Sequence, residues 1–192
     1  MSTAQLISTV IHMTSGTGHD EHRNDERRAG GRTAMRRRAA RVVYDGAVAF
    51  HVSASPTVVF DLITDVDRLP QWNAQIPRVI KSVENLVEGS EWVIVQRGLG
   101  PGVQWSSRAQ VIELNRATRR FVYRSRSEGP NPSFAMWTWS VTPAGKGSVV
   151  RVGWQLNPKT FWRKALTAGL RHRQLKREVR ASLQDMARLI DV

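Results

Sequence analysis

The sequence predicts an α+β fold, in which a seven-stranded curved antiparallel sheet wraps around one long C-terminal helix, with two short helices after the first strand. Two observations support this fold class. Seven strand-like runs follow one another along the chain, and short turn sequences separate the last six. Beyond Pro158, apolar residues recur at spacings of three and four, which is typical of an amphipathic helix packed on one face.

The chain enters the fold through one strand and a pair of short helices. The stretch "AVAFHVS" at 47–53 alternates apolar and polar residues, which indicates a half-buried strand. Ser55 is a good N-cap, and Pro56 suits the first helical position. A second short helix is expected over 65–71, where Pro70 stops it.

Three aspartates in "SPTVVFDLITDVDRLPQWN" raise the question of a metal site or an acid–base site. Asp61 lies on the polar side of the first helix. Asp65 fits the N-cap of the second helix, and Asp67 lies in its first turn, where a negative charge meets the helix dipole. We interpret all three as folding signals, and we expect neither a metal nor a cofactor.

Six further strands and the long helix complete the predicted order. The turns between them are rich in Gly, Pro and Asn, so consecutive strands should pair antiparallel. The six strands are expected at 78–85, 90–97, 103–114, 119–126, 134–142 and 148–156. The apolar stripe of the helix consists of Phe161, Ala165, Ala168, His172, Leu175, Val179, Leu183, Met186 and Ile190.

Composition places the domain at residues 42–192 of the 192-residue chain, after a basic tail at 1–41 that is expected to be disordered. The sequence has no cysteine, which excludes disulfides and thiolate chemistry. It shows neither a signal peptide nor an apolar run long enough for a transmembrane helix, and we predict a cytoplasmic protein.

Met35 is an alternative start of translation, so whether 1–34 belong to the native protein stays open. The net charge of +13 is concentrated at the two ends, which suits weak, non-specific contact with nucleic acid or an anionic membrane.

The order of elements resembles the START-like helix-grip (SRPBCC) superfamily, through the helix-pair sequence "ASPTVVFDLITDVDRLPQWN" and the strand pair "FAMWTWSVTPAGKGSVVRVGW". Its polyketide cyclase/dehydrase and lipid-transport family is the most similar branch, and the resemblance covers residues 46–190. It implies a helix-grip fold with a cavity between the sheet and the C-terminal helix. Members of that family include aromatase/cyclases and carriers of hydrophobic ligands.

Topology predicts where a binding site would open. The helix pair, the turns 98–102 and 127–133 and the helix start near 159–163 should lie at one end of the sheet and form a mobile rim, with Trp72 as its best ligand contact. Aromatic residues that share strand faces either fill the core or wall a cavity, and we favour the cavity because Trp packs poorly without a partner for its N–H. The candidate ligand-binding residues are Trp72, Trp105, Phe121, Tyr123, Trp137, Trp139, Trp154, His172 and Met186.

Three functions are consistent with the sequence. The first is binding of a hydrophobic small molecule of lipid, isoprenoid or polyketide type, as a carrier or sensor. The second is a cyclase or dehydratase-like enzyme, but catalysis needs a convergent acid and base. His172 is a weak catalytic candidate, as readily explained by burial, and we find no carboxylate clearly facing inward, since Glu113 shares the inward parity only at its strand end. The third is a protein- or RNA-interaction module that uses the basic ends.

Overall fold

The computed structural model of the protein describes residues 44–98, 102–130, 132–159 and 168–190, and it describes the side chains of the last range from Arg173 onwards. The described residues begin at Tyr44, so the predicted tail at 1–41 lies outside them. The elements in chain order are β1 (Tyr44–Val52), α1 (Pro56–Thr64), a 3₁₀ turn η1 (Val66–Arg68), α2 (Leu69–Trp72), β2 (Arg78–Lys81), β3 (Glu91–Arg97), β4 (Gln104–Asn115), β5 (Arg120–Ser127), β6 (Phe134–Ala144), β7 (Gly147–Asn157) and α3 (Ala168–Ile190).

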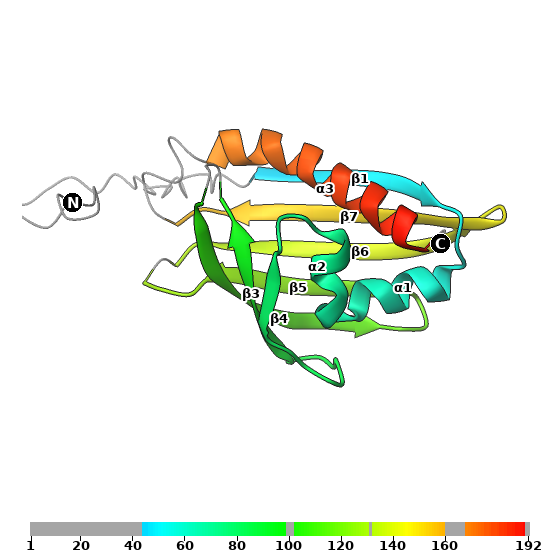
Figure 1. The fold of residues 1–192 in the computed structure, drawn as a ribbon, viewed down its shortest axis with the longest axis horizontal. Helices are drawn as coiled ribbons and strands as arrows, with labels where there is room; N and C mark the ends of the chain where they lie inside the picture. The colour runs from blue at the N-terminus through cyan, green and yellow to red at the C-terminus, as the bar shows by residue number, and fades with distance from the viewer. Residues whose placement is uncertain (1–43, 99–101, 131, 160–167, 191–192) are drawn as a thin grey trace, which may run out of the picture. The chain divides into compact units, whose positions relative to one another are not determined.

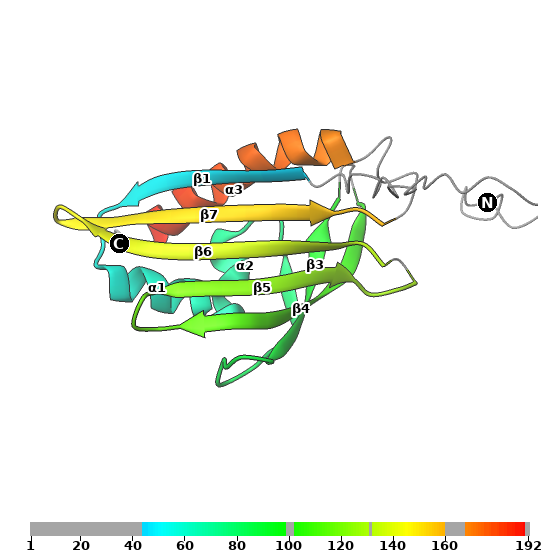
Figure 2. The same ribbon diagram turned by 180° about the vertical axis from the view of Figure 1, so that it is seen from behind.

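The sheet has seven antiparallel strands in the order β1-β7-β6-β5-β4-β3-β2. Strands β2 to β7 pair with their chain neighbours, as short turns require, and β1 pairs along its whole length with β7. The helices α1, α2 and α3 all lie on one face of this sheet, which Figure 1 shows from the helix side and Figure 2 from behind. The predicted α+β fold class is confirmed, and the inner face of the sheet and α3 enclose the interior.

The helix pair begins as predicted but ends differently. Ser55 caps α1, and its Oγ accepts a hydrogen bond from the backbone N–H of Val58 at 3.4 Å. Residues 66–68 form a 3₁₀ turn, and Pro70 lies in the first turn of α2. The prediction that Pro70 stops the second helix is therefore wrong, because a proline in the first helical turn leaves no hydrogen bond unmade.

Two of the three aspartates contribute to this local structure. Asp65 occupies the N-cap position of η1, where its backbone N–H donates to the Asp61 carbonyl at 2.9 Å. Asp67 accepts a hydrogen bond from the hydroxyl of Ser82 at 2.6 Å. Ser82 directly follows β2, which is shorter than the predicted strand at 78–85.

A β-bulge in β4 reverses the inward and outward alternation that the sequence suggests. The register shifts between Val111 and Glu113, so Val111 pairs with Tyr123 and Glu113 pairs with Val122. A bulge adds one unpaired residue, and the residues after it turn to the opposite face. Glu113, which shares the parity of Val111 in the sequence, forms an ion pair with Arg120 at 2.9 Å, and both side chains are partly exposed.

The interior around α1 and the C-terminal half of α3 is tightly packed. Its side chains are aliphatic and at most 2% exposed. We call this group the packed half, and it consists of Val52, Val59, Ile63, Val150, Val152, Leu183 and Met186. Gly147 closes it at the β6–β7 turn, because a Cβ at this position would lie 2.2 Å from the Val52 carbonyl oxygen.

Candidate functional site

A recess opens between the sheet and α3, beside the packed half. Strands β3, β5 and β6, the segment 73–76 after α2 and the middle of α3 provide its walls. Its volume, counted as the space open to the centres of water molecules, is about 50 Å³. The lining residues are Asn73, Gln75, Ile76, Ile94, Gln96, Tyr123, Ser125, Trp137, Trp139, Leu175, Glu178, Val179 and Ser182.

Aromatic rings form the sheet side of the recess. Tyr123 and Trp137 are cross-strand partners whose rings stack at 6.2 Å with planes 19° apart. Trp137 donates from Nε1 to the Ser125 hydroxyl at 3.1 Å, which fixes the ring against β5. Trp139 lies one inward position further along β6. These rings present a largely apolar wall, which also carries the Tyr123 hydroxyl and the indole nitrogens of Trp137 and Trp139.

Burial changes the acid–base behaviour of this wall. Tyr123 is half-buried, and the loss of water around its phenol raises its pKa, because the phenolate would be poorly solvated. The neighbouring Trp139 indole acts in the opposite direction and lowers the pKa. The phenol is therefore neutral across the physiological pH range and can donate a hydrogen bond.

The helix side of the recess is both apolar and polar. Leu175 and Val179 supply apolar contacts, and Glu178 and Ser182 line the same space. Glu178 accepts a hydrogen bond from the Gln174 side-chain amide at 2.6 Å. The sequence-based expectation that no carboxylate clearly faces inward is wrong, because Glu178 on α3 lines the recess.

Three predicted site residues, Tyr123, Trp137 and Trp139, lie on the recess wall. Trp72 is 1% exposed and contacts Trp139 edge-to-face at 5.8 Å, so its predicted position on an exposed rim is wrong. Trp72 is the last residue of the four-residue helix α2, which has Leu69 and Trp72 as its buried side chains. The predicted rim at 98–102, 127–133 and 159–163 falls partly outside the described residues.

Four further predicted residues, all of them described, do not line the recess. Phe121, Trp154 and Met186 are buried in the core, and Trp105 is half-buried near the start of β4. The side chain of His172 lies outside the described residues, so its predicted role stays a prediction. Sequence reasoning also missed Trp92, which is 2% exposed and stacks on Phe121 at 6.2 Å.

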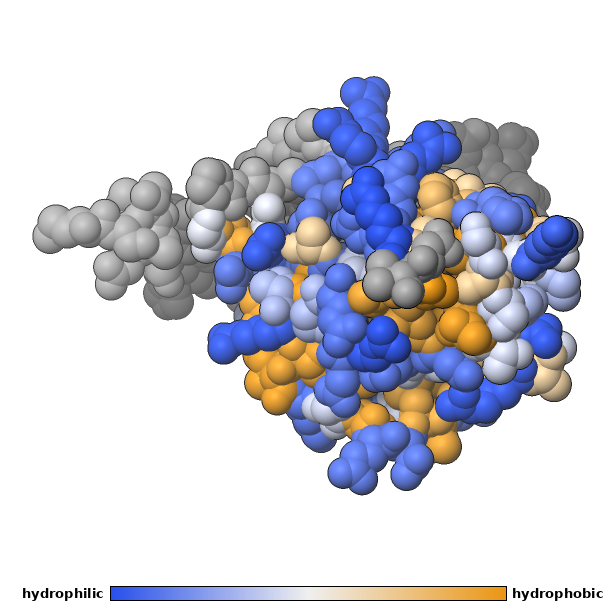
Figure 3. All heavy atoms as spheres, turned by 45° about the vertical axis from the view of Figure 1, so that its right-hand side comes forward, coloured by the Kyte–Doolittle hydropathy of each residue, from blue (hydrophilic) through white to orange (hydrophobic). Residues whose placement is uncertain are grey.

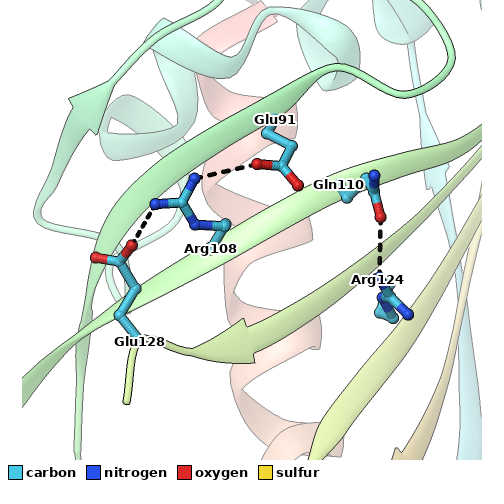
Figure 4. Close-up of polar contacts among 5 residues, drawn as sticks. All are labelled: Glu91, Arg108, Gln110, Arg124 and Glu128. Atoms are coloured by element: carbon cyan, nitrogen blue, oxygen red, sulfur yellow. Dashed lines mark hydrogen bonds and ion pairs between the residues drawn. The ribbon is translucent and has the colours of Figure 1, made fainter. Parts of the chain in front are cut away.

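The outer face of the sheet carries paired charges rather than a site. Arg108 lies between two carboxylates and bonds Glu91 at 3.1 Å and Glu128 at 2.7 Å (Figure 4). The hydrogen bond that Arg108 donates to Glu128, and then the one it donates to Glu91, raise the pKa of its guanidinium. On the neighbouring pair of strands, Arg124 donates to Gln110 at 2.9 Å. These residues point outward.

The outward side of α3 is basic. Its exposed side chains include Arg173, Lys176, Arg177 and Arg180, and hydrophilic side chains dominate the adjoining surface, with apolar patches between them (Figure 3). Among the described helices, none combines the length and the apolar character needed to cross a bilayer. Nor do any three His, Cys, Asp or Glu side chains gather around a common point in the ranges that the structure covers.

Comparison with known proteins identifies a matching family and other proteins that have the same fold. A family model described as "Polyketide cyclase / dehydrase and lipid transport" matches residues 45–191. A comparison with curated proteins found no significant match.

Several solved structures have the same architecture as this chain. The crystal structure of Ara h 8.0201 is 14% identical, with a TM-score of 0.61, and the match covers 78% of this chain and 98% of the other. Protein CV1439 from Chromobacterium violaceum is 16% identical, with a TM-score of 0.62 and coverage of 78% and 98%. The di-domain ARO/CYC StfQ from the steffimycin biosynthetic pathway is 16% identical, with a TM-score of 0.58 and coverage of 77% and 49%. At these identities the likeness establishes a shared fold.

Proposed function

Since this chain belongs to the polyketide cyclase / dehydrase and lipid transport family, we propose that it binds an apolar small molecule in the recess between the sheet and α3, as a carrier or sensor. The observation that carries this proposal is the composition of the recess. Aromatic and aliphatic side chains form most of its wall, and a few polar groups stand at fixed positions among them. That mixture is characteristic of small-molecule sites, where apolar surface gives affinity and polar groups set orientation.

Binding involves movement of the wall. The recess measures about 50 Å³, whereas ligand sites commonly enclose about 300–1,000 Å³. Tyr123 and Trp137 are only half-buried, so their rings have room to turn once the hydrogen bond from Trp137 to Ser125 breaks. A ligand of lipid, isoprenoid or polyketide type therefore selects an opened form of the recess.

A fluorescence titration with N-phenyl-1-naphthylamine, a neutral apolar probe, tests this proposal. Gln75 lines the recess from the segment after α2, so Gln75→Trp should fill it and weaken probe binding about tenfold or more. Gln71 is exposed on α2 and does not line the recess, so Gln71→Trp is the matched control and should bind like the native chain. Absence of saturable binding, or equal weakening by both variants, would contradict the proposal.

A second candidate function, cyclisation of a polyketide-type substrate, gains support from one pair of groups. Glu178 and Tyr123 line the same recess, so a carboxylate base and a neutral phenol donor converge on it. The carboxylate would take a proton from the carbon between two carbonyls, and this carbon would attack the ketone that the phenol holds by a hydrogen bond. The new carbon–carbon bond leaves an alkoxide on the former ketone, and the abstracted proton returns to that oxygen, so the carboxylate is regenerated. Turnover of a linear aryl triketone, followed by absorbance, should exceed the buffer rate and be lost in Glu178→Gln and in Tyr123→Phe. A native rate equal to buffer would exclude this candidate.

A further inference from the structure

One indole on the wall of the recess has no partner for its N–H group. Trp139 is 6% exposed and lines the recess from β6, and no described atom accepts a hydrogen bond from its Nε1. A buried donor without an acceptor costs free energy, because nothing replaces the water that solvates it in the unfolded chain. Trp139 therefore offers a hydrogen bond that a ligand can complete.

Position separates Trp139 from two other indoles in the same state. Nε1 of Trp72 and Nε1 of Trp92 are also buried without an acceptor among the described residues. Both rings are packed in the hydrophobic core, and neither lines the recess. Of these three donors, only the one on Trp139 belongs to a side chain that borders open space, so a ligand can complete its hydrogen bond.

The Tyr123 phenol supplies a second donor beside this indole. Tyr123 lies on β5, and its side chain lines the same recess. The Trp139 indole lowers the pKa of the phenol, as a donor near the phenol oxygen does, although the contact falls short of a hydrogen bond. An indole nitrogen cannot accept the phenol proton, so the Tyr123 O–H is left to donate in another direction.

Two adjacent donors suit a carbonyl oxygen. Such an oxygen has two lone pairs, so it can accept from the phenol and the indole together. It also brings no donor of its own that would need a partner in the recess. The rings of Tyr123, Trp137 and Trp139 surround these donors with apolar surface, which suits the body of the same ligand.

The two donors become accessible when the wall opens. Nε1 of Trp139 is covered in the structure, whereas Tyr123 is only half-buried and its ring has room to turn. A ligand oxygen therefore reaches the indole in the opened form of the recess that the proposed binding function already requires.

We propose that the apolar ligand of this recess carries a carbonyl group, whose oxygen accepts hydrogen bonds from Trp139 Nε1 and from the Tyr123 hydroxyl. The inference rests on the proposed binding function and adds the chemical class of the ligand. It separates apolar carbonyl compounds from hydrocarbons of the same shape.

Displacement of N-phenyl-1-naphthylamine by benzophenone and by diphenylmethane tests the inference. The two compounds share their rings and differ in one group, which is a carbonyl in the first and a methylene in the second. Benzophenone should displace the probe about tenfold better, because only its oxygen accepts the two hydrogen bonds. Burial of apolar surface alone would favour diphenylmethane, since a carbonyl loses its hydration when it enters an apolar site.

Two variants locate the preference, and a third is the control. Tyr123→Phe removes the hydroxyl and keeps the ring, and Trp139→Phe removes the indole N–H, so each should bring the two compounds to within about threefold of one another. Trp105→Phe removes an indole N–H from a half-buried ring that does not line the recess, and it should keep the native preference. Because Tyr123→Phe deletes a single oxygen atom, the test stands even where Trp139→Phe fails to fold.

The outcomes distinguish the two proposals. If neither compound displaces the probe and the probe itself does not bind saturably, the binding function and the carbonyl assignment both fail. If diphenylmethane displaces a saturably bound probe as well as benzophenone does, or if Tyr123→Phe leaves the preference unchanged, the binding function stands and the carbonyl assignment is overturned.

Discussion

The same two surfaces, the inner face of the sheet and one side of α3, build a packed half and a recess. In the packed half, Val150, Leu183 and Met186 show no measurable exposure. In the recess, Tyr123, Trp137 and Glu178 are each half-buried around open space. Aliphatic side chains fill the packed half, whereas half-buried rings and a carboxylate border the open space of the recess.

The two parts of α3 therefore have different roles. Its C-terminal half stabilises the fold by burying apolar surface, whereas its middle buries less and borders a space that a ligand can enter. Substitutions should therefore affect stability in the packed half and ligand binding in the recess.

The largest expected difference is between two leucines of α3. Leu183→Ala should lower the free energy of unfolding by about 2–5 kcal/mol, because it leaves a cavity in a filled core. Leu175→Ala enlarges a recess that is already open to solvent, so its cost should be smaller by about 1 kcal/mol or more. Urea unfolding of both variants measures this, and equal losses would remove the distinction between the halves.

A pair of glycines on β7 tests the closing turn of the packed half. A methyl group at Gly147 would meet the Val52 carbonyl oxygen at 2.2 Å, so Gly147→Ala should cost about 1–3 kcal/mol. At Gly153 the nearest atom is 3.8 Å away, an ordinary contact, and Gly153→Ala should fall within about 0.5 kcal/mol of the native chain. Thermal unfolding compares them, and a tolerated Gly147→Ala would show that the turn is not closely packed.

Alkaline pH should weaken the fold through Tyr123. Burial raises its pKa above the ordinary value of 10.0, so above that pH the unfolded chain loses a proton that the folded chain retains. Stability is unaffected by this group below pH 10 and falls as the pH rises beyond it, by at most about 1.4 kcal/mol per pH unit. Tyr123→Phe should remove this part of the slope in denaturant unfolding from pH 9 to 11. An identical slope in the variant would contradict the account.

The smallest expected effect is on the outer face of the sheet. Arg108→Ala breaks the ion pairs with Glu91 and Glu128, but the three side chains are roughly a third exposed and water replaces the lost contacts. Probe binding should be unchanged, since the residue points away from the recess. A change in probe affinity as large as that of Gln75→Trp would show that the two faces are coupled.

The sequence alone predicts the fold well, because turns and alternation are local signals. Seven strands, the helix pair and the long helix follow from them, and the cap at Ser55 has the expected geometry. The bulge that turns Glu113 outward leaves no comparable signal, since one extra residue is invisible in an alternating pattern.

The site was only partly predictable. Tyr123, Trp137 and Trp139 share a sheet face that alternation reveals. The burial of Trp72 depends on how α2 packs, which is a tertiary property that the local sequence does not show. Glu178 directly precedes Val179 of the apolar stripe, and the spacing of that stripe does not reveal that a side chain at its edge lines the recess.

Methyl NMR spectroscopy of the full chain, titrated with N-phenyl-1-naphthylamine, tests most directly whether the recess is the binding site. The account predicts saturable shifts for the methyl groups of Ile76, Ile94 and Val179, which line the recess. It predicts unchanged signals for Val59 and Leu183 in the packed half. Shifts confined to the packed half, or no saturable shift at any of these methyl groups, would contradict it.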